Sequence, residues 1–306
     1  MAPISSSVSR RAVLAALPAS ACVTPARGER FMPPQGLETP SESVMLSVSD
    51  EHVGVHFTAR LCRYPAYRVA WLWTHVKTPD GFFAYVDHAA PCTEDETPIG
   101  NLAHYADAAG VLRFSREGAS EDARAAHLAA RVSSRESGVV EADLAFRPAL
   151  MRAGLLEGRV EAFGPIEGDL RVNGRAFRIR GVGQFHEQRQ TEARFTTPFA
   201  FASLWGEGVG VTLLQIPEDS GGYILQQGAS TRTGRVRIAP PSANRTLRID
   251  FGANDAMEGH AVIETAYTIP LYGQTWHGAF VTAELGGHRL RGSLNDWRPE
   301  VLFGAS

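Results

Sequence analysis

The segment from residue 180 to residue 190, Arg-Gly-Val-Gly-Gln-Phe-His-Glu-Gln-Arg-Gln, holds the side chains best suited to chemistry. A carboxylate (Glu187), an imidazole (His186) and a guanidinium (Arg189) follow one another closely there. Alternate side chains of an extended strand share a face. Glu187 and Arg189 therefore share the face of Phe185, which we expect to be the interior. His186 points the other way unless a bulge at Gly183 shifts the phase.

Two interpretations of this row remain open. In the first, Glu187 and Arg189 form a structural ion pair that closes the mouth of a barrel, since buried charges are costly unless they are paired. In the second, burial lets Glu187 carry a proton at neutral pH, with Arg189 or His186 orienting it. Glu187 would then act as a general acid.

Aromatic side chains could line a cavity for an apolar ligand, although plain core packing is the alternative for each of them. The candidate ligand contacts are Trp71, Trp73, Trp205 and Trp276, together with Phe185 and Gln188 of the central segment. Tryptophan walls would also favour a cation that develops during a reaction.

Composition and missing motifs exclude several other classes of function. The net charge of −3 is too close to neutral for charge-driven binding to nucleic acid. Lys77 is the one lysine, so a P-loop lysine is absent, and the glycine-rich run Gly206–Gly210 leads into a strand rather than a helix. No G-x-S-x-G, C-x-x-C or H-E-x-x-H motif occurs, so neither a nucleophile elbow nor a metal site is predicted.

The first residues read as an export signal. Arg10 and Arg11 precede a short apolar run, and small residues follow it up to Cys22. The paired arginines resemble a twin-arginine signal. We therefore expect a signal over residues 1–22 and a proline-containing tether over residues 23–41, in a periplasmic or otherwise exported protein. Cys22 is a candidate for lipidation, which would be the chain's one link to a membrane, and a soluble cleaved form is the alternative.

The remaining cysteines, Cys62 and Cys92, would lie in an oxidising compartment after export. They could form a disulfide there. They could equally be free and buried.

Short strands separated by turn residues dominate the rest of the chain. Asn173-Gly174 between two alternating runs predicts a hairpin with a type I′ turn, and Thr78-Pro79-Asp80-Gly81 predicts another. Further strands are predicted at residues 53–62, 67–75, 82–88, 199–205, 208–216, 222–227, 232–238, 245–251, 260–269, 276–285 and 288–294. An N-cap and an alanine-rich run predict one short helix near residues 120–132.

A weak internal repeat suggests two copies of one β unit. At an offset of 156, residues 45–55 match residues 201–211 at several positions, including Ser47 with Ser203 and Val55 with Val211. The strand spacing predicts an all-β fold of antiparallel barrels or sandwiches. We expect an N-terminal unit over residues 42–160 and a C-terminal unit over residues 161–306.

Residues 43–88 and the strand from Gly181 to Arg189 resemble the AttH/carotenoid 1,2-hydratase-like superfamily. This resemblance implies two lipocalin-like β-barrel domains and a hydrophobic, often isoprenoid or polyene, ligand held between or inside the barrels. It implies no metal and no organic cofactor. Members include hydroxyneurosporene synthase, which hydrates a polyene end, and decalin-forming cyclases. Family hydratases carry an Asp-His-Asn-Trp-Gly-like run where this chain has His-Glu-Gln-Arg-Gln from residue 186.

Three hypotheses follow from the residues and the resemblance. The first is an exported, cofactor-independent hydratase, isomerase or cyclase that acts on an apolar unsaturated substrate, with Glu187 as proton donor and Arg189 and His186 as its orienting groups. The second is a non-catalytic periplasmic carrier of a hydrophobic ligand. The third is an adhesion or assembly module whose barrels are filled.

Overall fold

The computed structural model describes residues 21–22, 40–92, 102–107, 109–117, 125–153, 158–226, 229–252 and 255–297. This part of the chain is β structure, apart from turns and one 3-10 helix at Pro65–Tyr67. None of its helices is long and apolar enough to span a membrane. The predicted export signal and tether lie outside the described residues, except for residues 21–22 and 40–41.

Residues 41–190 form one antiparallel sheet, called here the first unit. Its strands are β2 (Ser41–Asp50), β3 (Val55–Tyr64), β4 (Val69–Thr78), β5 (Gly81–Pro91), β6 (Leu102–Ala106), β7 (Leu112–Glu117), β8 (Ala126–Ser134), β9 (Gly138–Phe146), β10 (Leu150–Ala153), β11 (Arg159–Val172) and β12 (Arg175–Gln190). The spatial order is β5-β4-β3-β2-β12-β11-β9-β8-β7-β6, and β10 pairs with β11.

Residues 199–297 form a second sheet, the second unit. Its strands are β13 (Phe199–Gly206), β14 (Val209–Gln215), β15 (Ser220–Gln226), β16 (Ala229–Arg232), β17 (Val236–Ile238), β18 (Asn244–Gly252), β19 (Asp255–Leu271), β20 (Gln274–Leu285) and β21 (His288–Trp297). The order is β16-β15-β14-β13-β21-β20-β19-β18-β17. The short strand β1 (Ala21–Cys22) adds to β19 in parallel.

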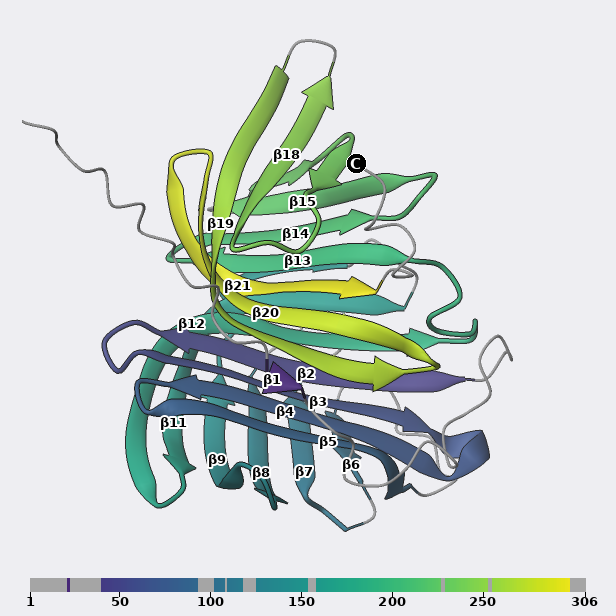
Figure 1. The fold of residues 1–306 in the computed structure, drawn as a ribbon, viewed down its shortest axis with the longest axis vertical. Coiled ribbons are helices and arrows are strands. Elements are labelled where there is room, and N and C mark those ends of the chain that lie inside the picture. Colours follow the sequence, from purple (N-terminus) through teal and green to yellow (C-terminus); the bar gives the residue numbers. More distant parts are fainter. Residues whose placement is uncertain are drawn as a thin grey trace, which may run out of the picture.

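Both units have the same topology. Each meander starts on a strand in the middle of its sheet, runs to one edge and continues from the opposite edge, and its last strand pairs with its first. The first hairpins of the two units, β2–β3 and β13–β14, carry the matching residues of the internal repeat. Each sheet curls over its own apolar interior (Figure 1). The all-β, two-unit architecture is therefore confirmed.

The predicted hairpins are confirmed at the level of register. Val172 pairs with Arg175 across Asn173 and Gly174, whose φ angles are 51° and 84°. Positive φ at both central positions is what a type I′ turn requires. The Asn173 side chain also accepts a hydrogen bond from the Val139 N–H at 2.7 Å, which ties this turn to the end of β9.

Two expectations about the elements are corrected. Residues 126–132 belong to strand β8, not to a helix, because Leu128 and Val132 alternate into the apolar interior while His127 and Arg131 do not. The burial of every second side chain in this segment stabilises a strand by more than the helix propensity of its alanines favours a helix. In addition, β11 and β12 complete the first sheet, so the chain changes sheet between residues 190 and 199 rather than at the expected boundary after residue 160.

The two units pack against each other through the outer faces of their sheets. Strand β2 lies next to β21, and β12 lies next to β13 (Figure 1). Aromatic residues of both units make up one apolar cluster at this interface, which includes Trp71, Trp73, Phe195, Tyr267 and Trp297. Strands β2 and β12 consequently have two buried faces, one toward the interior of the first unit and one toward the second unit.

Candidate functional site

A cavity of about 410 Å³ lies between the two units. Strands β2, β3, β4, β11 and β12 line it from the first unit, and β13, β14, β19, β20 and β21 line it from the second. The connection between β12 and β13 also contributes to the wall. The interiors of the two units hold their own apolar clusters, and the largely apolar lining of this cavity suits a small-molecule ligand.

Aromatic rings form the apolar wall of the cavity. Trp73 and Trp276 meet edge to face with their centroids 5.2 Å apart, and Phe199 packs edge-on against Trp276 at 5.4 Å. Tyr267 stacks on His75 at 4.0 Å. The wall draws rings from both units, so it exists only when the units are docked.

The opposite wall is polar and comes from the paired strands β11 and β12. In their register Arg159 faces Gln188 and Glu161 faces His186. All four side chains line the cavity. Strand β12 keeps an unbroken register with β2 from Val182 to Gln190, so no bulge at Gly183 shifts its phase.

Glu161 and His186 are the carboxylate and the imidazole of this wall. One carboxylate oxygen of Glu161, Oε1, accepts two hydrogen bonds from Arg159, at 2.8 Å from Nε and 2.5 Å from Nη2. The other oxygen, Oε2, is buried and has no hydrogen-bond partner in the described part of the chain. The same is true of His186 Nδ1. Glu161 and His186 are directly opposite in the register, so their Cβ atoms are about 5 Å apart, but Oε2 and Nδ1 make no hydrogen bond to one another in this structure.

His186 is held in its neutral form. Burial, followed by the positive charges of Arg159, Arg60 and Arg194, lowers the pKa of His186 well below 6.5. A neutral imidazole at neutral pH can take a proton. If Nδ1–H donates to Glu161, Nε2 is the nitrogen left for a bound molecule, and the carboxylate stabilises the imidazolium that forms.

Two further histidines near the cavity are also neutral. Burial lowers the pKa of His75 to about 3, and burial together with Arg60 lowers the pKa of His88 to about 3. His88 Nε2 accepts a hydrogen bond from Trp73 Nε1–H at 2.8 Å, which places the proton of the ring on Nδ1. His88 thereby fixes the orientation of the Trp73 ring in the cavity wall.

Glu187 faces the interior of the first unit, on the other side of the sheet from the cavity. Its Oε2 lies 2.5 Å from Arg116 Nε, and its Oε1 accepts a hydrogen bond from Tyr105. Phe185 shares this face and packs against Phe146. Glu187 therefore pairs with Arg116 from β7 and not with Arg189, the partner that the structural interpretation of the sequence predicts.

The structure brings only some of the predicted site residues to the cavity. His186, Gln188, Trp73 and Trp276 line it. Residues of the prediction that do not line it are Glu187, Arg189, Phe185, Trp71 and Trp205. Trp71 and Trp205 pack in apolar clusters at the same interface.

Sequence reasoning missed Glu161, although a signal for it exists. The row Gln184, His186, Gln188 and Gln190 of β12 is uniformly polar yet contains no fixed charge. An outer face exposed to water would carry charged residues, so this row indicates a second buried face. Its neighbours on β11 follow from the hairpin register set at Asn173-Gly174.

Cys62 and Cys92 are buried thiols that do not pair, so the open question of a disulfide is answered against one in this structure. The Cys92 thiol accepts a hydrogen bond from Arg63 Nε at 3.3 Å. Burial raises the pKa of the Cys92 thiol despite that hydrogen bond. No cluster of three or more potential metal ligands occurs in the part of the chain that the structure describes.

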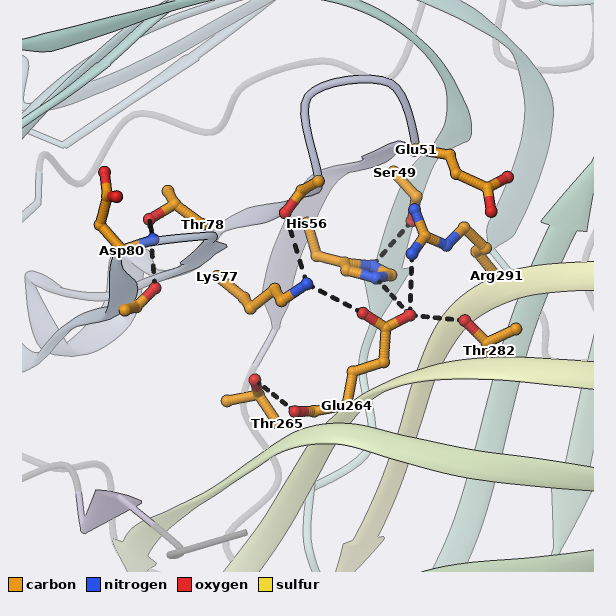
Figure 2. A network of polar contacts seen from close by, with 12 residues as sticks. Ser49, Glu51, His56, Lys77, Thr78, Asp80, Glu264, Thr265, Thr282 and Arg291 are labelled. Carbon is orange, nitrogen blue, oxygen red and sulfur yellow. Dashed lines mark hydrogen bonds and ion pairs between the residues drawn. The ribbon is translucent and has the colours of Figure 1, made fainter.

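A second polar cluster at the interface surrounds Glu264 (Figure 2). Its Oε1 accepts from Thr282 at 2.5 Å and from Arg291 at 2.9 Å, and it lies 3.2 Å from His56 Nε2. Its Oε2 lies 3.0 Å from Lys77 Nζ. Burial alone would raise the pKa of Glu264, but these partners outweigh burial and hold it far below its usual range.

His56 in this cluster is neutral, because burial outweighs the attraction of Glu264 and lowers the pKa of the imidazole. A carboxylate cannot donate, so Nε2 carries the ring proton and Nδ1 accepts from the Ser49 hydroxyl at 2.9 Å. The cluster thus joins β2, β3 and β4 of the first unit to β19 of the second (Figure 2).

Comparison with known proteins rests on structure alone. No protein-family model and no curated protein sequence matches this chain. CghA, also solved with Sch210972, has a TM-score of 0.59 at 12% identity, over 92% of this chain and 97% of CghA. A protein of Nitrosomonas europaea provisionally named AttH has a TM-score of 0.55 at 11% identity, over 90% of this chain and 98% of its own. Kievitone hydratase from Nectria haematococca has a TM-score of 0.51 at 10% identity, over 91% of this chain and 96% of its own. The AttH-like fold expected from the sequence is confirmed.

Proposed function

We propose that this protein is an enzyme that moves protons on a small, largely apolar, unsaturated substrate bound between the two units. The reaction class is that of a hydratase, isomerase or cyclase. The observation that carries the proposal is the Glu161–His186 pair, whose Oε2 and Nδ1 atoms lack partners among the described residues and lie in the wall of an aromatic cavity. The structural similarity to kievitone hydratase supports the same class.

His186 and Glu161 have different roles in the proposed reaction. Neutral His186 takes a proton from the substrate through Nε2, and Glu161 holds the imidazolium that results. The imidazolium exchanges its proton with solvent and returns one to another atom of the substrate, which gives isomerisation. In hydration, the elements of water add across a double bond, and in the reverse direction they leave. Trp73 and Trp276 would hold the unsaturated part of the substrate.

Deuterium exchange tests this proposal even while the substrate is unidentified. The protein is incubated in heavy water with a panel of small unsaturated apolar compounds, and solvent deuterium in each compound is measured by mass spectrometry. A catalyst that removes a proton, exchanges it with solvent and then returns one leaves deuterium in its substrate. We expect His186→Gln and Glu161→Gln to slow this exchange by at least about 100-fold, the usual contribution of a positioned acid–base group.

Two control variants test whether the loss of exchange is specific to Glu161 and His186. Glu258→Gln changes an exposed residue of β19 that does not line the cavity and should leave the exchange rate unchanged. Glu187→Gln, on the opposite face of β12, should also leave it unchanged. Loss of exchange in Glu187→Gln with retention in His186→Gln would contradict the assignment. Saturable binding with no exchange for any compound would favour a carrier instead.

The proposal includes export, for which the support is the arginine pair at Arg10 and Arg11 and the short apolar run after it. Fractionation of cells that express the full chain tests it. Replacement of both arginines by lysine should retain the protein in the cytoplasm. Lipidation at Cys22 predicts a membrane fraction that Cys22→Ala abolishes, whereas a soluble exported protein would not change.

A further inference from the structure

Three arginines reach the polar end of the cavity, and they differ in how their charge is balanced. Arg159 is neutralised by Glu161. Arg60 and Arg194 have no carboxylate partner among the described residues, although both line the cavity. Two guanidinium groups without counter-charge at the end of one apolar cavity are costly to bury, unless a ligand supplies the missing charge.

Arg60 extends from β3 and is held from two sides. Its Nε donates to Ser43 Oγ at 3.1 Å, and its guanidinium lies 4.8 Å from the centroid of the Trp73 ring. Its Nη1 is buried and has no hydrogen-bond partner in the described ranges. Burial lowers the pKa of Arg60, and the charges of Arg194 and Arg159 act in the same direction.

Arg194 approaches from the connection between β12 and β13. Its Nε donates to Ser41 Oγ at 2.8 Å, and its Nη1 donates weakly to Gln188 Oε1 at 3.4 Å. Its Nη2 is buried and has no partner within the part of the chain described. Arg60 and Arg194 therefore each have a buried N–H group still available, while their Nε groups are fixed by the protein.

We propose that Arg60 and Arg194 form a binding site for the carboxylate of the substrate. The proposal rests on the proposed function and specifies its substrate class, an apolar unsaturated carboxylic acid. The planar guanidinium forks match the geometry of a carboxylate. The apolar remainder of the molecule would extend along Trp73 toward Trp276, past His186. The carboxylate would supply the counter-charge that both arginines lack among the described residues.

A pair of probes of equal shape tests this inference. 2-Naphthoic acid and 2-naphthamide differ mainly in charge, and their affinities for the full chain are measured by isothermal titration calorimetry at neutral pH. We expect the acid to bind at least about tenfold more tightly, since hydrogen bonds to charged groups are the stronger ones. In the Arg60→Gln/Arg194→Gln double variant this preference should disappear, while the affinity for the amide stays the same.

The Arg232→Gln/Arg237→Gln double variant is the matched control, because it also removes two positive charges, from exposed positions of the second unit, and should leave the preference intact. Equal affinity of the native protein for both probes would overturn the carboxylate site and leave the proposed proton chemistry standing. A preference for the acid that survives in the double variant would also overturn it. A failure of the proposed function would be detected in a different experiment. Deuterium exchange would then not depend on Glu161 or His186.

Discussion

Glu161 is fully buried and Glu264 is partly buried at the interface between the units, and both pair with arginine, but their surroundings differ. Lys77, Thr282 and Arg291 donate to the two oxygens of Glu264, and His56 Nε2 lies 3.2 Å from one of them (Figure 2). Among the described residues Arg159 alone serves Glu161, and one oxygen of that carboxylate is left without a partner. A carboxylate whose hydrogen bonds are complete stabilises the fold. A carboxylate that lies beside a cavity and has an oxygen without a hydrogen-bond partner can interact with a bound molecule.

The backbone around Glu264 is irregular, whereas the backbone around Glu161 is regular. Glu264 is the extra residue of a β-bulge, since Ile263 pairs with Val281 and Thr265 pairs with Phe280. A bulge redirects a side chain, and here it turns Glu264 toward His56 and Lys77 of the other unit. Glu161 lies in a regular stretch of β11, so its position follows from ordinary cross-strand pairing.

The largest predicted effect is on stability at the Glu264 cluster. Glu264→Gln removes the shared counter-charge of Lys77 and Arg291, which are both mostly buried. We expect the free energy of unfolding to fall by about 3 kcal/mol, the scale for breaking a buried pair. Chemical denaturation measures it. Glu258→Gln, which removes an exposed ion pair with Arg248, is the control and should leave the free energy of unfolding nearly unchanged.

Acid should weaken the same cluster. The folded-state pKa of His56 lies below 6.5, so its contribution to stability is complete above that pH and is lost as the pH falls through the folded value. Glu264, whose pKa is also lowered, adds its loss at more acidic pH. We expect stability to fall between pH 7 and pH 5, and His56 to contribute at most about 1.4 kcal/mol per pH unit to a slope that His75, His88 and His186 also increase.

His56→Gln is the variant that isolates this titration, because glutamine keeps a donor but cannot be protonated. Its free energy of unfolding should change less than that of the native protein between pH 7 and pH 5. An identical pH dependence of both proteins would show that another group causes the acid sensitivity.

A smaller loss of stability is expected at Glu161. Glu161→Gln leaves Arg159 with the Gln188 side chain and with the Phe201 ring, 4.8 Å from its guanidinium. We expect a cost of about 1–2 kcal/mol in chemical denaturation, below that of Glu264→Gln. The two clusters share no residue among those described, so the costs in the double variant should add within about 0.5 kcal/mol. Marked non-additivity would show that the clusters are coupled through the interface.

The sequence predicts the fold well because its signals are local. Turn residues such as Asn173-Gly174 and alternation along the strands determine where hairpins form, and neither signal depends on the other unit. The helix expected near residue 126 failed for a tertiary reason. The interior of the first unit accepts Leu128 and Val132 from one face of a strand, and that burial outweighs alanine propensity.

The site was predicted less well because it depends on how the two sheets dock. Alternation along β12 correctly separates Glu187 from His186, but it does not say which face meets a cavity. The apolar pattern marks only the face of Phe185 as buried, whereas the docking of the second unit buries both faces. Glu161 is distant from His186 in the sequence and reaches it only through the β11–β12 register.

The smallest predicted effect tests whether the Glu187 cluster is purely structural. Burial, followed by the charge of Glu187, raises the pKa of Tyr105, so its phenol stays protonated and donates to the carboxylate. Tyr105→Phe removes that hydrogen bond and keeps the Arg116 ion pair. We expect unfolding to become easier by about 1 kcal/mol, with no change in deuterium exchange. If Tyr105→Phe slowed deuterium exchange as much as His186→Gln is expected to, the reaction would take place in the interior of the first unit and not at the interface. The hydrogen bonding of a buried carboxylate would then not distinguish a structural residue from a functional one.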